Sequence, residues 1–146
     1  MKIIGCGNPD RGDDGAGVLV AERLRELGIA AETHTGEPMA LIESCRSADY
    51  VILIDGVVTG APPGTVHLWD GPPQRLLHGA EVSTHGLDLA QAIELAQALG
   101  RLPARLRLYG IEARQFDSGS SVSPEVELAI QSVVRQITSN ELVPCH

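Results

Sequence analysis

The amino-acid sequence predicts an α/β protein, a three-layer α/β/α sandwich around a mixed five-stranded sheet in which strand 4 is antiparallel. Two observations carry this prediction. Short apolar runs alternate along the chain with segments whose apolar residues recur at helical spacing. One connection between consecutive strands is also too short for a parallel crossover. Such sheets bind ligands at the carboxyl ends of their strands, which is where we look for a site.

Composition limits the class of protein. The 146 residues, 43% hydrophobic and 21% charged, fit one globular domain, which we expect over residues 1–138 with a flexible tail over 139–146. The net charge of -8 and the single lysine argue against nucleic-acid or anionic-membrane partners. We find no signal peptide and no apolar segment of about 20 residues, and we therefore expect a cytoplasmic protein.

A loop rich in glycine and aspartate follows the first predicted strand, the apolar run 2–6. It carries Asp10, Asp13 and Asp14 among five glycines between residues 5 and 17. Glycines allow tight turns and close approach to a ligand, which is typical of a binding loop. Three carboxylates would repel a phosphate, so we expect this loop to attract a cation.

Periodicity and composition predict the next elements in order. Apolar residues at helical spacing indicate a helix over residues 15–27. A weaker strand pattern follows over 29–35, and a short helix over 38–45. The β-branched run 50–54 is typical of a buried strand, and we expect it to stop at Asp55, at the carboxyl edge of the sheet.

The connection to the next strand predicts its direction. Only nine residues separate Asp55 from the strand-like run 65–69, whereas a parallel crossover normally needs a dozen or more. We therefore expect this fourth strand to be antiparallel. A loop over 70–82 then leads to a helix with Ser83 or Thr84 as N-cap.

The last third of the chain supplies one more strand and one more helix. The helix that follows residue 84 should place His85 in its first turn and end at Gly100. The run 106–111 predicts the fifth strand. Ser123, followed by proline, is a typical start for a last helix that reaches Ile137.

Asp14, Asp55 and His85 form the candidate site. Asp14 and Asp55 follow two strands of the same edge, and His85 joins them if the loop after the reversed fourth strand returns there. Two carboxylates and one imidazole are a plausible three-ligand set for a divalent metal. The alternatives are structural: Asp13 and Asp14 as helix caps, Asp55 as a turn residue and His85 as a packed histidine.

The other thiols and imidazoles lack a motif. The cysteines at 6, 45 and 145 form no CxxC pair and predict reduced thiols. Cys6 fits a small buried residue, with a Cys6–His85 nucleophile pair as the alternative. His34, His67 and His78 show no metal-ligand spacing, so we expect them in the core or in solvent.

A phosphorelay receiver domain is an alternative of a different class. Adjacent acids after strand one, an acid at the end of strand three and Thr84 are similar to the magnesium-binding, phosphate-accepting site of that family. Receiver domains also use a lysine at the end of strand five, whereas the only lysine here is Lys2. A non-catalytic chaperone or metal-binding module is a third alternative.

The chain resembles the nickel-iron hydrogenase maturation proteases, peptidase family M52, along nearly its whole length. The matching segments are residues 4–9 (IGCGNP), 13–18 (DDGAGV), 54–56 (IDG), 83–87 (STHGL), 109–112 (YGIE) and 121–126 (SVSPEV). The resemblance implies a phosphorylase/hydrolase-like fold with strand four antiparallel. It also implies a metal-dependent aspartyl-type endopeptidase.

The resemblance also implies a site and a substrate. Asp14, Asp55 and His85 correspond to the family's metal-contacting and catalytic residues, and Asn8, Asp13 and Glu32 are candidate supporting residues. Glu32 departs from the pattern because a threonine, not a glycine, follows it. The implied substrate is the nickel-loaded precursor of a hydrogenase large subunit, which loses a short C-terminal peptide. Nickel would then be presented by the precursor, and another divalent metal could replace it in vitro.

Overall fold

The structure, a computed structural model, describes residues 1–8, 10, 12–34, 38–45, 48–72, 83–84, 89–114 and 121–141. The strands are β1 (Lys2–Cys6), β2 (Glu32–His34), β3 (Tyr50–Val58), β4 (Val66–Gly71), β5 (Ser83–Thr84) and β6 (Arg105–Glu112). The helices are α1 (Ala16–Glu26), α2 (Pro38–Ser44), α4 (Leu89–Ala98) and α5 (Pro124–Gln136), with a 3-10 turn η1 (Gly12–Gly15) and a π-helical turn η2 (Ile137–Glu141). No helix within these ranges is long and apolar enough to cross a membrane.

A mixed sheet forms the middle layer. Its strands lie in the order β2-β1-β3-β6-β4, and the first four of these run parallel. β4 is antiparallel to β6, which confirms the direction predicted from the short connection after Asp55. β5 adds a two-residue antiparallel pairing at the end of β3, so it is a sixth, short strand beyond the five predicted.

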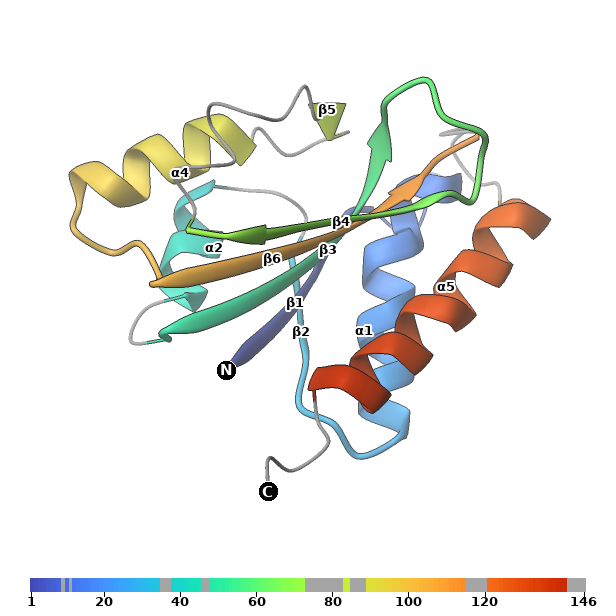
Figure 1. The fold of residues 1–146 in the computed structure, drawn as a ribbon, viewed down its shortest axis with the longest axis horizontal. Helices are drawn as coiled ribbons and strands as arrows, with labels where there is room; N and C mark the ends of the chain where they lie inside the picture. The colour runs from blue at the N-terminus through green and yellow to red at the C-terminus, as the bar shows by residue number, and fades with distance from the viewer. Residues whose placement is uncertain are drawn as a thin grey trace.

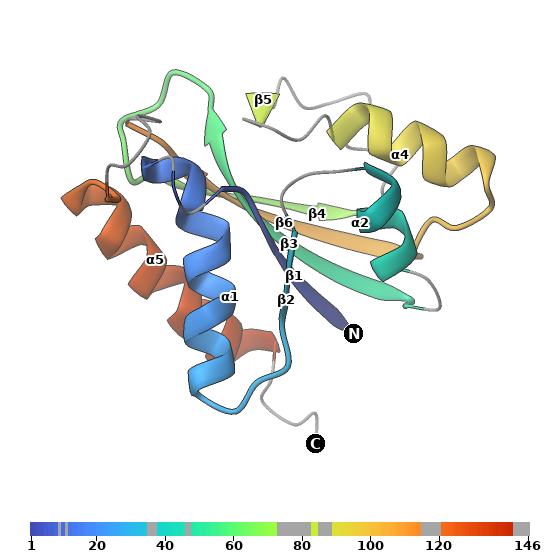
Figure 2. The ribbon, with the colours of Figure 1, turned by 180° about the vertical axis from the view of Figure 1, so that it is seen from behind.

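Two layers of helices cover this sheet (Figures 1 and 2). α1 and α5 lie against one face, and α2 and α4 lie against the other. Alternate residues of each strand enter opposite cores, as the period of two requires. On β3, Ile52 and Ile54 pack with α1 and α5, whereas Val51 and Leu53 pack with α2 and α4. The three-layer α/β/α sandwich is therefore confirmed.

Among the element boundaries that differ from the predictions, three matter most for the site and the last helix. β3 continues past Asp55 to Val58 because β6 stays in register with it, pairing Asp55 with Gly110 and Val57 with Glu112. Residues 83 and 84, predicted as the N-cap of the next helix, form the short strand β5, and the described part of that helix begins at Leu89. Residues 85–88, on which the predicted N-cap depends, lie outside the described residues. The last helix runs into η2 and reaches Glu141, whereas residues 142–146 of the expected tail lie outside the described residues.

Gly17 lets helix α1 press directly against the sheet. A Cβ atom at Gly17 would lie 2.2 Å from the carbonyl oxygen of Ile54 and 2.5 Å from that of Cys6. A Cβ at Gly5 would in turn lie 2.1 Å from the Gly17 oxygen. This close approach brings the acidic turn η1, which precedes α1, over the carboxyl ends of β1 and β3.

Candidate metal site at the carboxyl edge of the sheet

Asp55 is a buried carboxylate near the end of β3. Only 1% of the residue is exposed. Its Oδ1 accepts a hydrogen bond from the Gly56 N–H at 2.8 Å, while its Oδ2 has no hydrogen-bond partner among the residues that the structure describes. Burial raises the pKa of Asp55 well above its usual range; the Gly56 hydrogen bond opposes the rise and the negative charge of Asp14 adds to it.

Asp14 lies close to Asp55, although 41 positions earlier in the chain. It belongs to η1, and 3% of it is exposed. Its Oδ1 lies 3.8 Å from the position that a Cβ on Gly7 would occupy, at the end of β1. The influence of Asp14 on the pKa of Asp55 reflects two carboxylates that share a buried space. A cation between two such carboxylates would relieve both burial and repulsion, so this donor pair fits a divalent metal.

Asp13 makes a different set of contacts. Its Oδ2 accepts from the Arg114 N–H at 2.6 Å, and its Oδ1 accepts from the Ser123 N–H at 2.8 Å. The Ser123 hydroxyl also donates to both carboxylate oxygens. The prediction that Asp13 or Asp14 caps α1 is wrong, because the N-cap is Gly15 and no side chain bonds there. Asp13 instead joins the acidic turn to the start of α5.

The two other candidate supporting residues differ in position. The Asn8 N–H donates to the Asp14 carbonyl at 3.1 Å, and the Asn8 side chain accepts from the Asp10 N–H, so Asn8 shapes the acidic loop. Glu32 pairs in register with Ile4, two residues before the carboxyl end of β1 at Cys6. Its carboxylate lies 3.4 Å from the Lys2 ammonium group. The structure therefore does not bring Glu32 to the Asp14–Asp55 pair.

His85 lies outside the described residues. The backbone of Thr84, which immediately precedes it, pairs with Val57, two residues beyond Asp55. Within the described ranges no group of three histidine, cysteine, aspartate or glutamate residues could hold a metal ion. The three-ligand set thus stays a prediction that depends on His85.

The thiol of Cys6 does not suit a nucleophile. Cys6 is fully buried and packs in the α2–α4 core. Burial raises the pKa of this thiol, and the charges of Asp55 and Cys45 add to the rise. Because the thiolate is the reactive form, this environment favours the small apolar role over the Cys6–His85 pair.

Glu112 is a buried acid at the same edge, and sequence reasoning gave it no role. Its carboxylate accepts from the Thr59 hydroxyl at 2.6 Å, the Thr59 N–H at 2.9 Å and the His67 Nε2–H at 3.0 Å. Burial alone would raise the pKa of Glu112, but these hydrogen bonds outweigh it and lower the pKa below its ordinary value. The sequence held a signal that Glu112 is buried. Side chains alternate along a strand, so residue 112 lies on the same face as Leu106 and Leu108, which pack in the α2–α4 core.

Comparison with protein families and curated relatives gives one consistent result. The HycI family model, described as hydrogenase maturation protease, matches residues 35–140. The hydrogenase expression/formation protein HupD of Thiocapsa roseopersicina is 27% identical over 92% of this chain. HupD of Rhodobacter capsulatus is 28% identical over 94% of it. The chain spans 64% of the first relative's length and 70% of the second's.

Solved structures share the fold. The hydrogenase maturating endopeptidase HybD from E. coli has a TM-score of 0.75 and 25% identity, with 95% of this chain and 91% of that one covered. The maturation protease HycI from Thermococcus kodakarensis KOD1 has a TM-score of 0.69 and 27% identity, with 94% and 88% covered. These findings favour the protease resemblance over the receiver domain. The chain belongs to the hydrogenase maturation protease family.

Proposed function

We propose that this protein is an endopeptidase that removes a short C-terminal peptide from the nickel-loaded precursor of a nickel-iron hydrogenase large subunit. Membership of the family supports the reaction, as do the names of the relatives. The structural observation that carries the proposal is the Asp55 carboxylate, which is buried beside Asp14 with its Oδ2 unpartnered among the described residues. A buried carboxylate oxygen without a hydrogen-bond partner is costly to the fold, so a function that uses it is favoured.

The two carboxylates would contact the nickel ion of the precursor. Asp14 and Asp55 offer hard oxygen donors, and His85 would add an imidazole nitrogen. A divalent cation beside a peptide bond polarises its carbonyl or orients an attacking water. In this proposal the nickel ion is part of the substrate. In vitro, binding of another divalent ion to the protein would show whether the same side chains can bind a metal.

Proton transfer falls to Asp55 or Asp14 rather than to Asp13. The Asp13 carboxylate already accepts hydrogen bonds from Arg114 and Ser123, which hold it in a structural role. The raised pKa of Asp55 brings that carboxyl closer to the range in which a general base works at neutral pH.

The direct test is cleavage of the precursor. Purified protein is incubated with nickel-loaded or metal-free large-subunit precursor, and the products are weighed by mass spectrometry. We expect one C-terminal peptide to leave only the nickel-loaded form. Equal cleavage of the metal-free precursor would contradict the nickel-dependent part, and no cleavage of either would contradict the peptidase assignment.

Substitutions distinguish residues that the reaction needs from neighbouring residues that it does not need. Asp55→Asn and His85→Ala should abolish cleavage while circular dichroism stays unchanged. Asp10→Asn is a matched control, because Asp10 is an exposed acid of the same loop. Binding of the nickel-loaded precursor without turnover would instead support the non-catalytic chaperone or metal-binding module.

A further inference from the structure

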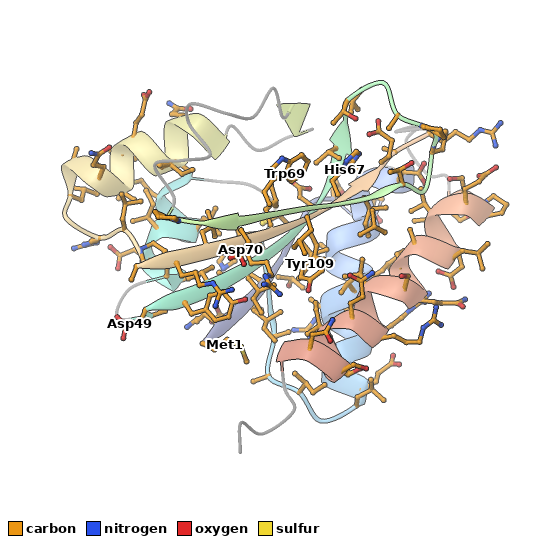
Figure 3. The ribbon with its side chains drawn as sticks, in the orientation of Figure 1. Met1, Asp49, His67, Trp69, Asp70 and Tyr109 are labelled. Atoms are coloured by element: carbon orange, nitrogen blue, oxygen red, sulfur yellow. The ribbon has the colours of Figure 1, made fainter. Side chains whose placement is uncertain are left out.

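A chain of contacts leads from Glu112 to an aromatic ring beside the candidate site. Oε1 of Glu112 accepts from Nε2 of His67 at 3.0 Å and from the Thr59 hydroxyl, and Oε2 accepts from the Thr59 N–H. The His67 ring stacks on Trp69 with ring centroids 5.3 Å apart and an interplanar angle of 23°. Figure 3 shows both rings projecting from β4 on the same side. Each contact limits the rotation of the next side chain.

Trp69 reaches across the sheet to the neighbour of Asp55. A Cβ on Gly110 would lie 2.8 Å from Cζ3 of the Trp69 ring and 3.0 Å from a methyl of Val57. Gly110 is the register partner of Asp55, and adjacent strands lie about 4.8 Å apart. The absence of a side chain at Gly110 thus leaves room for the indole edge on the strand next to Asp55, on the face that Val51 and Leu53 also share.

We propose that Trp69 is a specificity-determining residue that contacts an apolar side chain of the substrate, one or two residues from the scissile bond. This inference rests on the peptidase function proposed above. An extended peptide advances about 3.4 Å per residue, so a peptide bond held at Asp55 places a residue one or two positions away beside the Trp69 ring, which covers the buried Gly110. Trp69 is partly exposed there and able to meet that residue.

The chemistry around the indole favours an apolar side chain. The methyl groups of Val57, which is fully buried, lie at the same Gly110 position, so the ring sits in apolar surroundings. Glu112, the nearby acid on β6, is only 2% exposed and already accepts three hydrogen bonds, so little of its carboxylate is open to a substrate side chain. A ring held by stacking also loses little conformational freedom when the substrate binds, which makes its contact effective.

His67 and Glu112 are positioning residues in this arrangement. They act through Trp69, because the described contacts connect them to the ring and to Thr59. Replacing the imidazole by another flat ring, His67→Phe, should preserve the stack, whereas His67→Ala should release the indole. We therefore expect the phenylalanine variant to rescue substrate affinity and the alanine variant to lose it.

The test compares cleavage kinetics of the nickel-loaded precursor. Trp69→Ala should raise KM about tenfold or more with little change in kcat, and Trp69→Phe should stay close to wild type. Leu68→Ala is the matched control, since Leu68 immediately precedes Trp69 on β4, points to the opposite face and is 49% exposed. Circular dichroism and thermal unfolding show whether each variant is folded.

A second change, in the precursor, identifies the partner of Trp69. The apolar residues flanking the scissile bond are replaced one at a time by alanine. For one of them, the KM difference between wild type and Trp69→Ala should disappear. A folded Trp69→Ala enzyme with unchanged KM for every precursor would overturn the inference while leaving the peptidase function intact. Absence of cleavage by wild type would overturn both.

Trp69 also offers a direct signal of contact, because it is the only tryptophan of the chain. Labelled with fluorotryptophan, the active enzyme gives one fluorine resonance by NMR, free of signals from the precursor. We expect this resonance to shift during turnover at saturating nickel-loaded precursor. A resonance that keeps its position under those conditions would overturn the proposed contact.

Discussion

The Asp13 carboxylate accepts a hydrogen bond from the backbone N–H of Ser123, 110 residues later in the chain, at 2.8 Å. The same carboxylate accepts from the Arg114 N–H, so one side chain joins the acidic turn, the segment after β6 and the start of α5. Ser123 occupies the N-cap position, yet its hydroxyl donates to Asp13 and makes no capping hydrogen bond. The acidic turn is thereby fixed where Asp14 faces Asp55.

Asp13→Ala should therefore destabilise the fold. The change leaves buried N–H donors without their acceptor, and hydrogen bonds to charged groups are each worth about 1.5–3 kcal/mol. We expect a loss of about 3 kcal/mol in the free energy of unfolding, measured by urea denaturation. Asp10→Ala, in the same loop, should stay within about 0.5 kcal/mol of wild type. Equal stability of both variants would show that the Asp13 contacts contribute little.

Asp55 should make the protein less stable as pH rises. Its folded-state pKa is raised by burial, so the folded protein holds this proton more tightly than the unfolded chain does. The stabilisation is complete below the unfolded pKa of about 3.9 and is lost as pH rises through the folded pKa. Asp55→Asn removes this dependence and should unfold at a higher temperature than wild type near neutral pH.

Thermal unfolding of both proteins across pH checks this expectation. The difference in melting temperature should be smallest in acid, where Asp55 is neutral, and should grow toward neutral pH. A divalent cation that binds the carboxylates should stabilise wild type and not Asp55→Asn, and more strongly at higher pH. An Asp55→Asn protein with the same pH profile as wild type would contradict the raised pKa.

The layers of this fold follow from local patterns, whereas the roles of single polar residues depend on distant partners. The run at 50–54 predicts a buried strand, and the short connection after it predicts the antiparallel β4. The end of β3 was missed because β6 and β5, far away in sequence, extend its pairing to Val58. The role of Asp13 was missed for the same reason, since Arg114 and Ser123 lie about a hundred residues away.

The effects of close approach and of backbone strain can be separated with two glycines, Gly17 in α1 and Gly28 just after its end. Gly17 has no room for a Cβ against the Ile54 and Cys6 carbonyls, while Gly28 has open space but a φ of +83°. Gly17→Ala should cost about 3 kcal/mol or more in unfolding free energy, as overpacking against backbone does. Gly28→Ala should cost about 1–2 kcal/mol for the left-handed conformation. Similar losses in denaturant titrations would contradict the close packing of α1 on the sheet.

Glu112 should stabilise the fold with the opposite pH dependence to Asp55. Its pKa is lowered in the folded state because the hydrogen bonds from Thr59 and His67 outweigh the effect of burial. The stabilisation is therefore present above the unfolded pKa of about 4.3 and is lost as pH falls through the folded pKa. Glu112→Gln cannot accept all of these hydrogen bonds and should cost about 1–3 kcal/mol at neutral pH.

The pH profile distinguishes this charge effect from a simple loss of packing. Urea unfolding of wild type and Glu112→Gln should give a stability difference at neutral pH that shrinks as wild-type Glu112 becomes protonated. Glu125→Gln is a suitable control, because Glu125 is a partly exposed partner of Arg114 and surface ion pairs contribute about 0–1 kcal/mol. A Glu112→Gln penalty that stays constant into acid would indicate that shape, and not charge, makes Glu112 necessary.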